Sequence, residues 1–295
     1  MRSNLPSPPR YKPWTKGVYE VAPGLKSLGT DYGNGDSDGK LFQFDTDYSR
    51  YLENKHRCLE ERKGKYVMRE KLSPSVEAAV VELMAERLVK EWPELFTRIG
   101  ETLQCELTGQ TIPLALDQLM LQVQEDLAVV VISEGQDWIG YLNICCPSHW
   151  IAETKIGRSF FETHIPIPGF ERVNAVAHTM ALSMVHKGPF VRFVWGLTAD
   201  DRLNQHPEPP PGIPVEEWDT RKSPGAMTIR VERQTTWGLP EVGAAIFAIR
   251  VGFTEGEEVR KVPEEWKALQ ATVRSMSAES QAYKGLAGFL PILDI

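Results

Sequence analysis

The stretch 226–237, Ala-Met-Thr-Ile-Arg-Val-Glu-Arg-Gln-Thr-Thr-Trp, is the segment that decides the fold of this sequence. Successive side chains of a β-strand point to opposite faces, so one face receives Met227, Ile229, Val231, Arg233, Thr235 and Trp237. The other face receives Arg230, Glu232, Gln234 and Thr236. The alternation predicts a strand with one mostly apolar face.

Four more strands are predicted around this one. Residues 190–197 alternate well, with Val191, Phe193, Trp195 and Leu197 on one side, and residues 244–253 follow the 226–237 stretch after a short turn. Upstream, the apolar run 128–132, the turn 133–137 and the strand 138–145 predict a hairpin. The section between, residues 148–187, is predicted to be mostly helical.

The N-terminal part has a different character. The first 60 residues are rich in Pro, Gly and Asp, and we expect residues 1–70 to form an extended wrap over the surface. A helix is predicted to begin at the cap Ser73 with Pro74 in its first position, and to end at Pro93. Further helices are expected at 113–124 and 263–275, so that residues 71–295 form one unit of helices and sheet together with the wrap.

Two strands, then helices, then three antiparallel strands is also the order of a PAS-type fold. We therefore predict an α+β fold, with a PAS-like five-stranded antiparallel sheet, a helical insert between strands 2 and 3, and an N-terminal helical extension. This topology predicts a pocket between the sheet and the insert, although topology alone implies no function.

Composition excludes several classes of protein. The 295 residues carry 33 Lys and Arg against 40 Asp and Glu, a net charge of −7, which argues against nucleic-acid binding. No apolar run is long enough to span a membrane, and the N-terminus has no secretory apolar region. The four scattered cysteines are read most simply as reduced thiols, so we expect a cytoplasmic protein.

Motifs for common chemistries are absent from the sequence. There is no G-x-S-x-G elbow, no Walker loop, no H-E-x-x-H and no dinucleotide fingerprint after a strand. Cys145, Cys146 and His149 lie close together, but adjacent cysteines suit one tetrahedral zinc poorly. We interpret both thiols as small buried hydrophobes.

The stretch from Asn34 to Asp45 imitates a calcium-binding loop. Oxygen-bearing side chains fall at its positions 1, 3, 5 and 12, and Gly39 falls at position 6. The first position is Asn, however, and no amphipathic helix precedes it. A solvated acidic loop is the favoured interpretation, and cation binding stays open.

Two histidines are candidate ligands for a haem iron. His164 lies in Phe-Phe-Glu-Thr-His-Ile-Pro-Ile-Pro-Gly, residues 160–169, where apolar residues and prolines would hold an imidazole rigidly and away from water. His178, in the following helix, is the second candidate. The alternative for His164 is a core histidine bonded to a backbone carbonyl, and the local sequence alone favours that alternative.

Arg233 falls on the apolar face of the 226–237 strand. A buried guanidinium needs an anionic partner, because an unpaired buried charge is strongly destabilising. Glu125 or Asp126 would make a structural pair, whereas a haem propionate would make a ligand contact. The sequence favours neither reading over the other.

Several segments, in order along most of the chain, together resemble the haem-dependent oxidative N-demethylase family, alpha-subunit type. The matching segments are 9–14 (PRYKPW), 44–48 (FDTDY), 124–127 (QEDL), 146–150 (CPSHW), 155–157 (KIG), 164–169 (HIPIPG), 230–235 (RVERQT), 239–240 (LP), 249–250 (IR) and 283–285 (YKG). Each segment is short, but their order and spacing are specific.

The resemblance implies a PAS-like fold that binds haem b through a histidine. It also implies oxidation of a small methylated amine by O2, with electrons from NADPH through separate flavin and iron–sulfur components. On motif position His164 would be the iron ligand, and Arg233 and Arg230 would contact the cofactor. Gln234 would be a catalytic residue only if the strand twists or bulges, because alternation points it away from Arg233.

The chain departs from the family at two places. Val194 stands where the family tends to have Asn, and Val251-Gly252 stand where Thr-Tyr is common, so the substrate need not be dimethylamine. The chain has no ferredoxin cysteine pattern and no dinucleotide fingerprint, so an enzyme of this kind needs a partner reductase. A haem or small-ligand sensor without turnover is the main alternative, and a structural or interaction protein with a remodelled pocket is the third.

Overall fold

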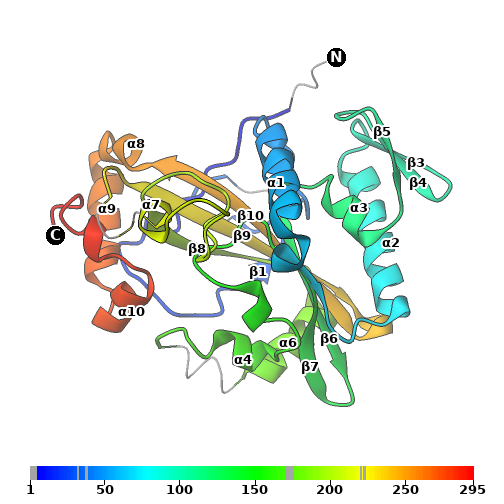
Figure 1. Cartoon of the computed structure of the whole chain (residues 1–295). Coiled ribbons are helices and arrows are strands. Elements are labelled where there is room, and N and C mark those ends of the chain that lie inside the picture. Colours follow the sequence, from blue (N-terminus) through cyan, green and yellow to red (C-terminus); the bar gives the residue numbers. More distant parts are fainter. Residues whose placement is uncertain (1–4, 32, 37–38, 170–175, 220, 222–223) are drawn as a thin grey trace.

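A twisted antiparallel sheet runs through the centre of the molecule, and helices and long loops cover both of its faces (Figure 1). The computed structural model describes residues 5–31, 33–36, 39–169, 176–219, 221 and 224–295. The strands of these residues are β1 (Lys26–Ser27), β2 (Val67–Arg69), β3 (Phe96–Ile99), β4 (Thr102–Cys105), β5 (Gln110–Pro113), β6 (Asp126–Ser133), β7 (Gln136–Asn143), β8 (Phe190–Thr198), β9 (Thr228–Leu239) and β10 (Ala244–Glu255).

The helices of the described residues are mostly short. They are α1 (Tyr48–Tyr66), α2 (Pro74–Glu91), α3 (Leu116–Met120), α4 (Phe160–His164), α6 (Ala177–Lys187), α7 (Val215–Trp218), α8 (Gly256–Arg260), α9 (Pro263–Arg274) and α10 (Ala278–Tyr283). Single 3₁₀ turns are η1 (Ala152–Thr154), η3 (Pro240–Val242) and η4 (Ala287–Phe289).

The central sheet has seven strands in the order β1-β8-β9-β10-β6-β7-β2. The α+β class and the antiparallel pairing are confirmed, and each of the five expected strands is present as β6 to β10. The expected number of strands was wrong. The two-residue β1 and the three-residue β2 extend the sheet at its edges, and they are too short for alternation to reveal them.

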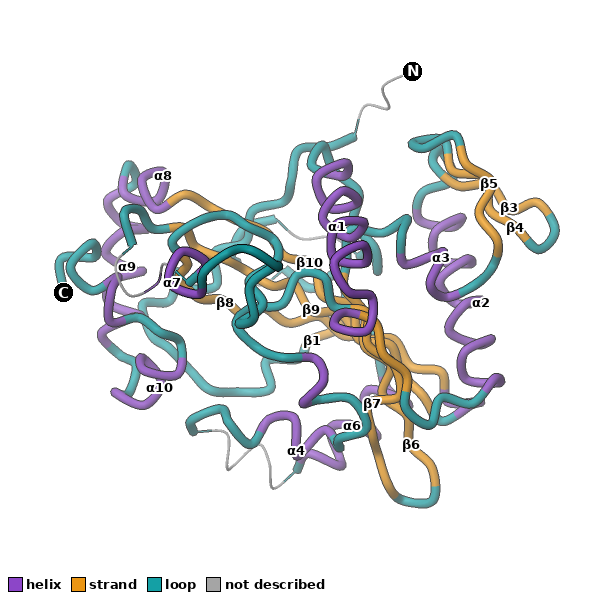
Figure 2. Tube along the Cα trace, viewed as in Figure 1, coloured by secondary structure: helices purple, strands orange, loops and turns teal. Residues whose placement is uncertain are grey.

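A separate three-stranded sheet, β3-β4-β5, packs beside α2 and α3 (Figure 2). The sequence pattern does not predict this sheet. Each of its strands has only four residues, and the exposed turns Gly100 and Gly109 adopt positive φ values of 57° and 68°. Runs of this length carry too few alternating positions to be recognised.

The N-terminal segment also differs from the expected extended wrap. The extended path ends at Asp47, because residues 48–66 form α1. Trp14, Leu41 and Phe42 are fully buried, so the wrap contributes to the core instead of lying on the surface.

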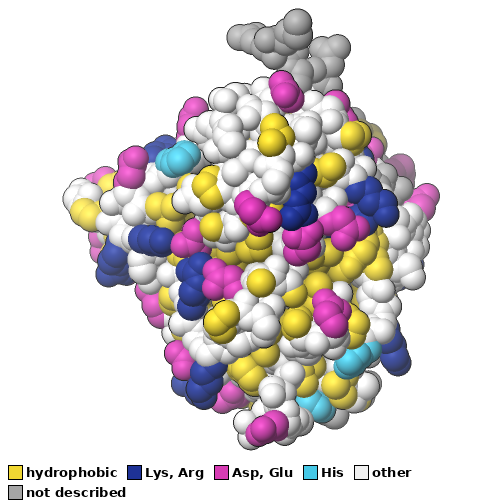
Figure 3. Space-filling view, turned by 90° about the vertical axis from the view of Figure 1, so that its right-hand side faces the viewer, with side chains coloured by type: hydrophobic (Ala, Val, Ile, Leu, Met, Phe, Trp, Pro, Cys, Tyr) yellow, Lys and Arg dark blue, Asp and Glu magenta, His cyan; other side chains and the backbone are white. Residues whose placement is uncertain are grey.

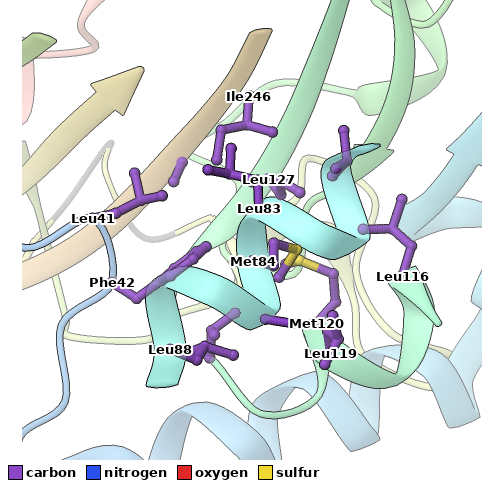
Figure 4. Packing of buried hydrophobic residues seen from close by; sticks show 14 of the residues in the cluster. Leu41, Phe42, Leu83, Met84, Leu88, Leu116, Leu119, Met120, Leu127 and Ile246 are labelled. Atoms are coloured by element: carbon purple, nitrogen blue, oxygen red, sulfur yellow. The ribbon is translucent and has the colours of Figure 1, made fainter. Parts of the chain in front are cut away.

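The main core fills the space between one sheet face and α2 with α3. Figure 4 shows Leu83, Met84 and Leu88 of α2 in one cluster with Leu127 and Ile246 of the sheet. Helix α2 matches its prediction, since the side chain of Ser73 accepts a hydrogen bond from the backbone of Val76 and Pro74 is the first helical residue. Figure 3 views the side of the molecule that carries this helix, where acidic and basic side chains are interspersed.

No helix within the described residues combines the length and apolar character that a bilayer crossing requires.

Candidate functional site

The two faces of the central sheet pack against different parts of the chain. On one face, Ala244, Ile246 and Ala248 of β10 join the core beneath α2. On the other, Ala245, Phe247 and Ile249 pack with the insert between β7 and β8, which includes α4 and α6. We call this second side the insert face. It is defined by the alternating residues Ala245, Phe247, Ile249, Val251 and Phe253 of β10 and by the residues in register with them on β9 and β8.

The insert is anchored at both ends of its path across this face. Helix α4 begins with a capping box, in which Ser159 and Glu162 exchange hydrogen bonds, and the backbone N–H of Phe160 donates to Asp137 of β7 at 2.6 Å. Helix α6 packs over β9, where Gly238 lies against the backbone of Val185. The insert is therefore held to strands on both sides of β10.

His164 is the last residue of α4, and it is partly buried. Its Nδ1 lies 2.7 Å from the carbonyl oxygen of Phe160, one turn earlier in the chain. A carbonyl only accepts hydrogen bonds, so Nδ1 donates and carries the proton, and the neutral ring then has an unprotonated Nε2. Burial lowers the pKa of His164 to about 4, and the charge of Arg192 contributes to this lowering.

The central part of the insert face is only partly covered by protein. Phe247 and Ile249 of β10, Glu232 and Gln234 of β9, and Val194 of β8 all retain intermediate exposure in the middle of the sheet. A Cβ atom added at Gly196 of β8 would meet no atom within 4 Å. This partly open surface, with apolar and polar side chains, could take a flat ligand.

Gln234 and Arg230 both lie on the insert face. The register of β9 with β8 and β10 is unbroken, and Gln234 stands between Arg192 and Ile249. Gln234 therefore faces the insert without the bulge or twist that its expected role required. Its Nε2 donates to Glu232 at 2.9 Å. Arg230 donates to the carbonyls of Leu203 and Cys146, which ties the insert face to two loops.

Arg233 lies on the opposite face. It is in register with Phe193 and Arg250, and its Nη2 donates to the carbonyl of Lys40 at 2.6 Å. Glu125, one of the two expected partners, is close enough for Arg233 to act on its pKa. The alternation of β9 is thus confirmed, but the structure separates Arg233 from His164 by the thickness of the sheet.

His178 is placed at the surface. Its side chain is 47% exposed, and its Nδ1 lies 3.2 Å from Asp137. The structure therefore gives the second candidate ligand much less shielding from water than it gives His164.

The other residues singled out in the sequence have structural partners. Cys145 and Cys146 are buried, and their backbone N–H groups donate to Asp126, so their interpretation as buried hydrophobes is confirmed. His149 is mostly buried and has a positive φ of 57°, and burial lowers its pKa to about 3.

The calcium-like loop is solvated only in part, because Asp36 is exposed whereas Asn34 and Asp45 are buried. Asp45 is buried and forms an ion pair with Arg250, and Asp36 accepts a hydrogen bond from the backbone of Arg10. Asp38 lies outside the described residues. Among the residues that are described, no group of three or more His, Cys, Asp or Glu side chains is arranged to hold a metal ion.

A cavity of about 1130 Å³ lies at another part of the sheet. Residues 7–11, the start of α1, the end of β10 and helix α8 line it, and Arg250 and Tyr51 are among the buried side chains on its wall. Its described lining includes neither His164 nor Gln234.

Sequence reasoning missed Arg192 and Glu232. The alternation of residues 190–197 was used to identify the apolar side of β8, and the same pattern assigns Arg192 and Val194 to the other side. The insert covers that other side, a fact that the sequence alone did not reveal.

The fold and the site thus define an antiparallel α+β protein with a partly buried histidine on a helical insert. Residues 35–292 match the family model described as haem-dependent oxidative N-demethylase, alpha subunit-like. The match covers most of the 295 residues, and the chain belongs to this family.

Proposed function

We propose that this chain binds haem b on the insert face through His164 and oxidises a small methylated amine with O2. The observation that carries the proposal is the state of His164, a partly buried neutral imidazole whose Nδ1 proton is committed to a backbone carbonyl. This is the arrangement that leaves Nε2 as the ligating nitrogen of a metal-bound histidine. Family membership supports the same group.

The residues of the insert face fit a haem. Phe247, Ile249 and Val194 offer a partly exposed apolar surface on the sheet, and His164 stands on the insert that crosses the same face. The succession of two strands, an insert and three antiparallel strands supports a PAS-like classification of the five central strands.

The reaction balances as a two-electron oxidation assisted by a reductase. The methylated amine, O2, two electrons and two protons give the demethylated amine, formaldehyde and water. When bound, haem supplies the redox centre for this chemistry. The electrons would come from NADPH through a separate flavin and iron–sulfur protein, because this chain carries no sequence motif for either group.

Gln234 is the residue of this chain that we propose to orient the amine. A carboxylate only accepts hydrogen bonds, so the bond to Glu232 identifies Nε2 of Gln234 and thereby fixes the direction of its amide oxygen. That oxygen can accept a hydrogen bond from a substrate N–H. Phe247 and Ile249 give the same surface an apolar character.

The test begins with the absorption spectrum of the purified protein supplied with haem. We expect a Soret band that His164→Ala abolishes and His178→Ala leaves unchanged. Consumption of O2 with a reductant and a methylated amine, together with formaldehyde release, then separates an enzyme from a sensor. A full Soret band in the H164A protein would refute the ligand assignment, and a haem protein without formaldehyde release would refute the demethylase.

A further inference from the structure

Arg192 projects from β8 into the region where the proposed function places the haem. Arg192, Gln234 and Ile249 are in register across β8, β9 and β10, so their side chains share one face. Ile249 packs with the insert cluster, which identifies that face as the insert face. Arg192 retains intermediate exposure there.

Several positive charges surround this part of the insert face. Arg192 is close enough to His164 and to Lys284 for its charge to lower the pKa of both, after the larger effect of burial. Lys155 donates to the carbonyl of Thr163, next to His164. Glu232 is the neighbouring carboxylate, and it accepts a hydrogen bond from Gln234.

Contacts of β1 and of the segment before it bring Arg192 and His164 together near the β1 edge of the sheet. Lys26 of β1 pairs with Val191, directly beside Arg192. Gly169, five residues after His164, lies against Val21, which is part of the segment leading into β1. The segment that starts at His164 therefore reaches the β1 edge of the sheet, next to the strand β8 that carries Arg192.

We infer that Arg192 anchors a haem propionate. The inference rests on the proposed function, because it concerns the group that His164 is proposed to hold. A guanidinium forms strong paired hydrogen bonds with a carboxylate, and a partly buried position strengthens them. Arg233 cannot take this role on the insert face, because it points to the other side of the sheet.

The test compares haem with haem dimethyl ester, in which both propionates are esterified and uncharged. The dissociation constants of both ligands are measured by Soret titration. We expect the wild-type protein to prefer haem by about ten- to a hundred-fold, the range that a charge-assisted hydrogen bond provides. Arg192→Gln should reduce this preference toward unity, and Arg192→Lys should retain part of it.

Arg158→Gln is the matched control. Arg158 is another arginine of the insert, but it is exposed and pairs with Glu162 at the surface, so this substitution should leave the preference unchanged. Circular dichroism establishes that each variant is folded. If Arg192→Gln does not fold, the wild-type comparison still decides, because equal affinity for haem and its ester would overturn the inference.

The outcomes separate the inference from the proposed function. Haem binding through His164 with an unchanged ester preference in the R192Q protein overturns the anchor and leaves the function standing. Absence of a Soret band in the wild-type protein supplied with haem overturns the proposed function, and the anchor with it.

Discussion

Removing the carboxylate of Asp45 should destabilise the protein strongly. Its Oδ2 lies 2.5 Å from Nη2 of Arg250, and both side chains are less than 5% exposed. Its Oδ1 accepts hydrogen bonds from the backbone of Asp47 at 2.9 Å and from Nε2 of Gln124 at 3.0 Å. Asp45 thus ties the extended N-terminal segment to the start of α1 and to β10.

The size of the expected loss of stability follows from the burial of the Asp45–Arg250 pair. Asp45→Ala leaves the charge of Arg250 buried without its closest carboxylate, which costs about 3–5 kcal/mol in comparable buried pairs. Asp201 offers the matched control, because its pair with Arg50 is 2.9 Å long but exposed. Asp201→Ala should therefore cost about 0–1 kcal/mol.

Urea unfolding followed by tryptophan fluorescence measures both free energies. The double variant with Asp45→Ala and Arg250→Leu should lose less stability than the sum of the two single variants, because the second change removes the charge that the first one leaves unpaired. A cost for D45A no larger than the cost for D201A would refute this reasoning.

Two further changes test the packing and the buried charges. Gly238→Ala should cost about 1–3 kcal/mol of stability through overpacking, because the added Cβ would lie 2.0 Å from the carbonyl oxygen of Val185. Gly196→Ala on β8 is the control and should be neutral, because an added Cβ there meets no atom within 4 Å. Equal melting temperatures for the two variants would contradict this packing. Burial raises the pKa of Glu125 from 4.5 to about 7. Between these two pH values the folded state therefore binds more protons than the unfolded state, and the free energy of unfolding should fall as pH rises. Glu125→Gln should flatten that fall in unfolding midpoints measured from pH 5 to pH 8, and an unchanged slope would show that another group titrates.

The strands that matter for the site could be predicted because each is long and regular. β8 and β9 alternate over eight or more residues, and a register shift of one residue would move every side chain to the opposite face of the sheet. The cap at Ser73 and the proline at the start of α2 are equally local signals. The short strands β1 to β5 carry no such redundancy, so their pairing depends on neighbours that are distant in sequence.

The candidate site was only half predictable for the same reason. The sequence of residues 160–169 determined a rigid apolar setting for His164, and the alternation of 226–237 determined which residues lie on opposite faces of β9. Neither pattern says which face a distant insert covers. The covered face is determined by contacts between residues that are distant in sequence: α6 packs over β9, and the backbone of Phe160 donates a hydrogen bond to Asp137. Tertiary packing therefore decided that Arg192 and Gln234, and not Arg233, share a face with His164.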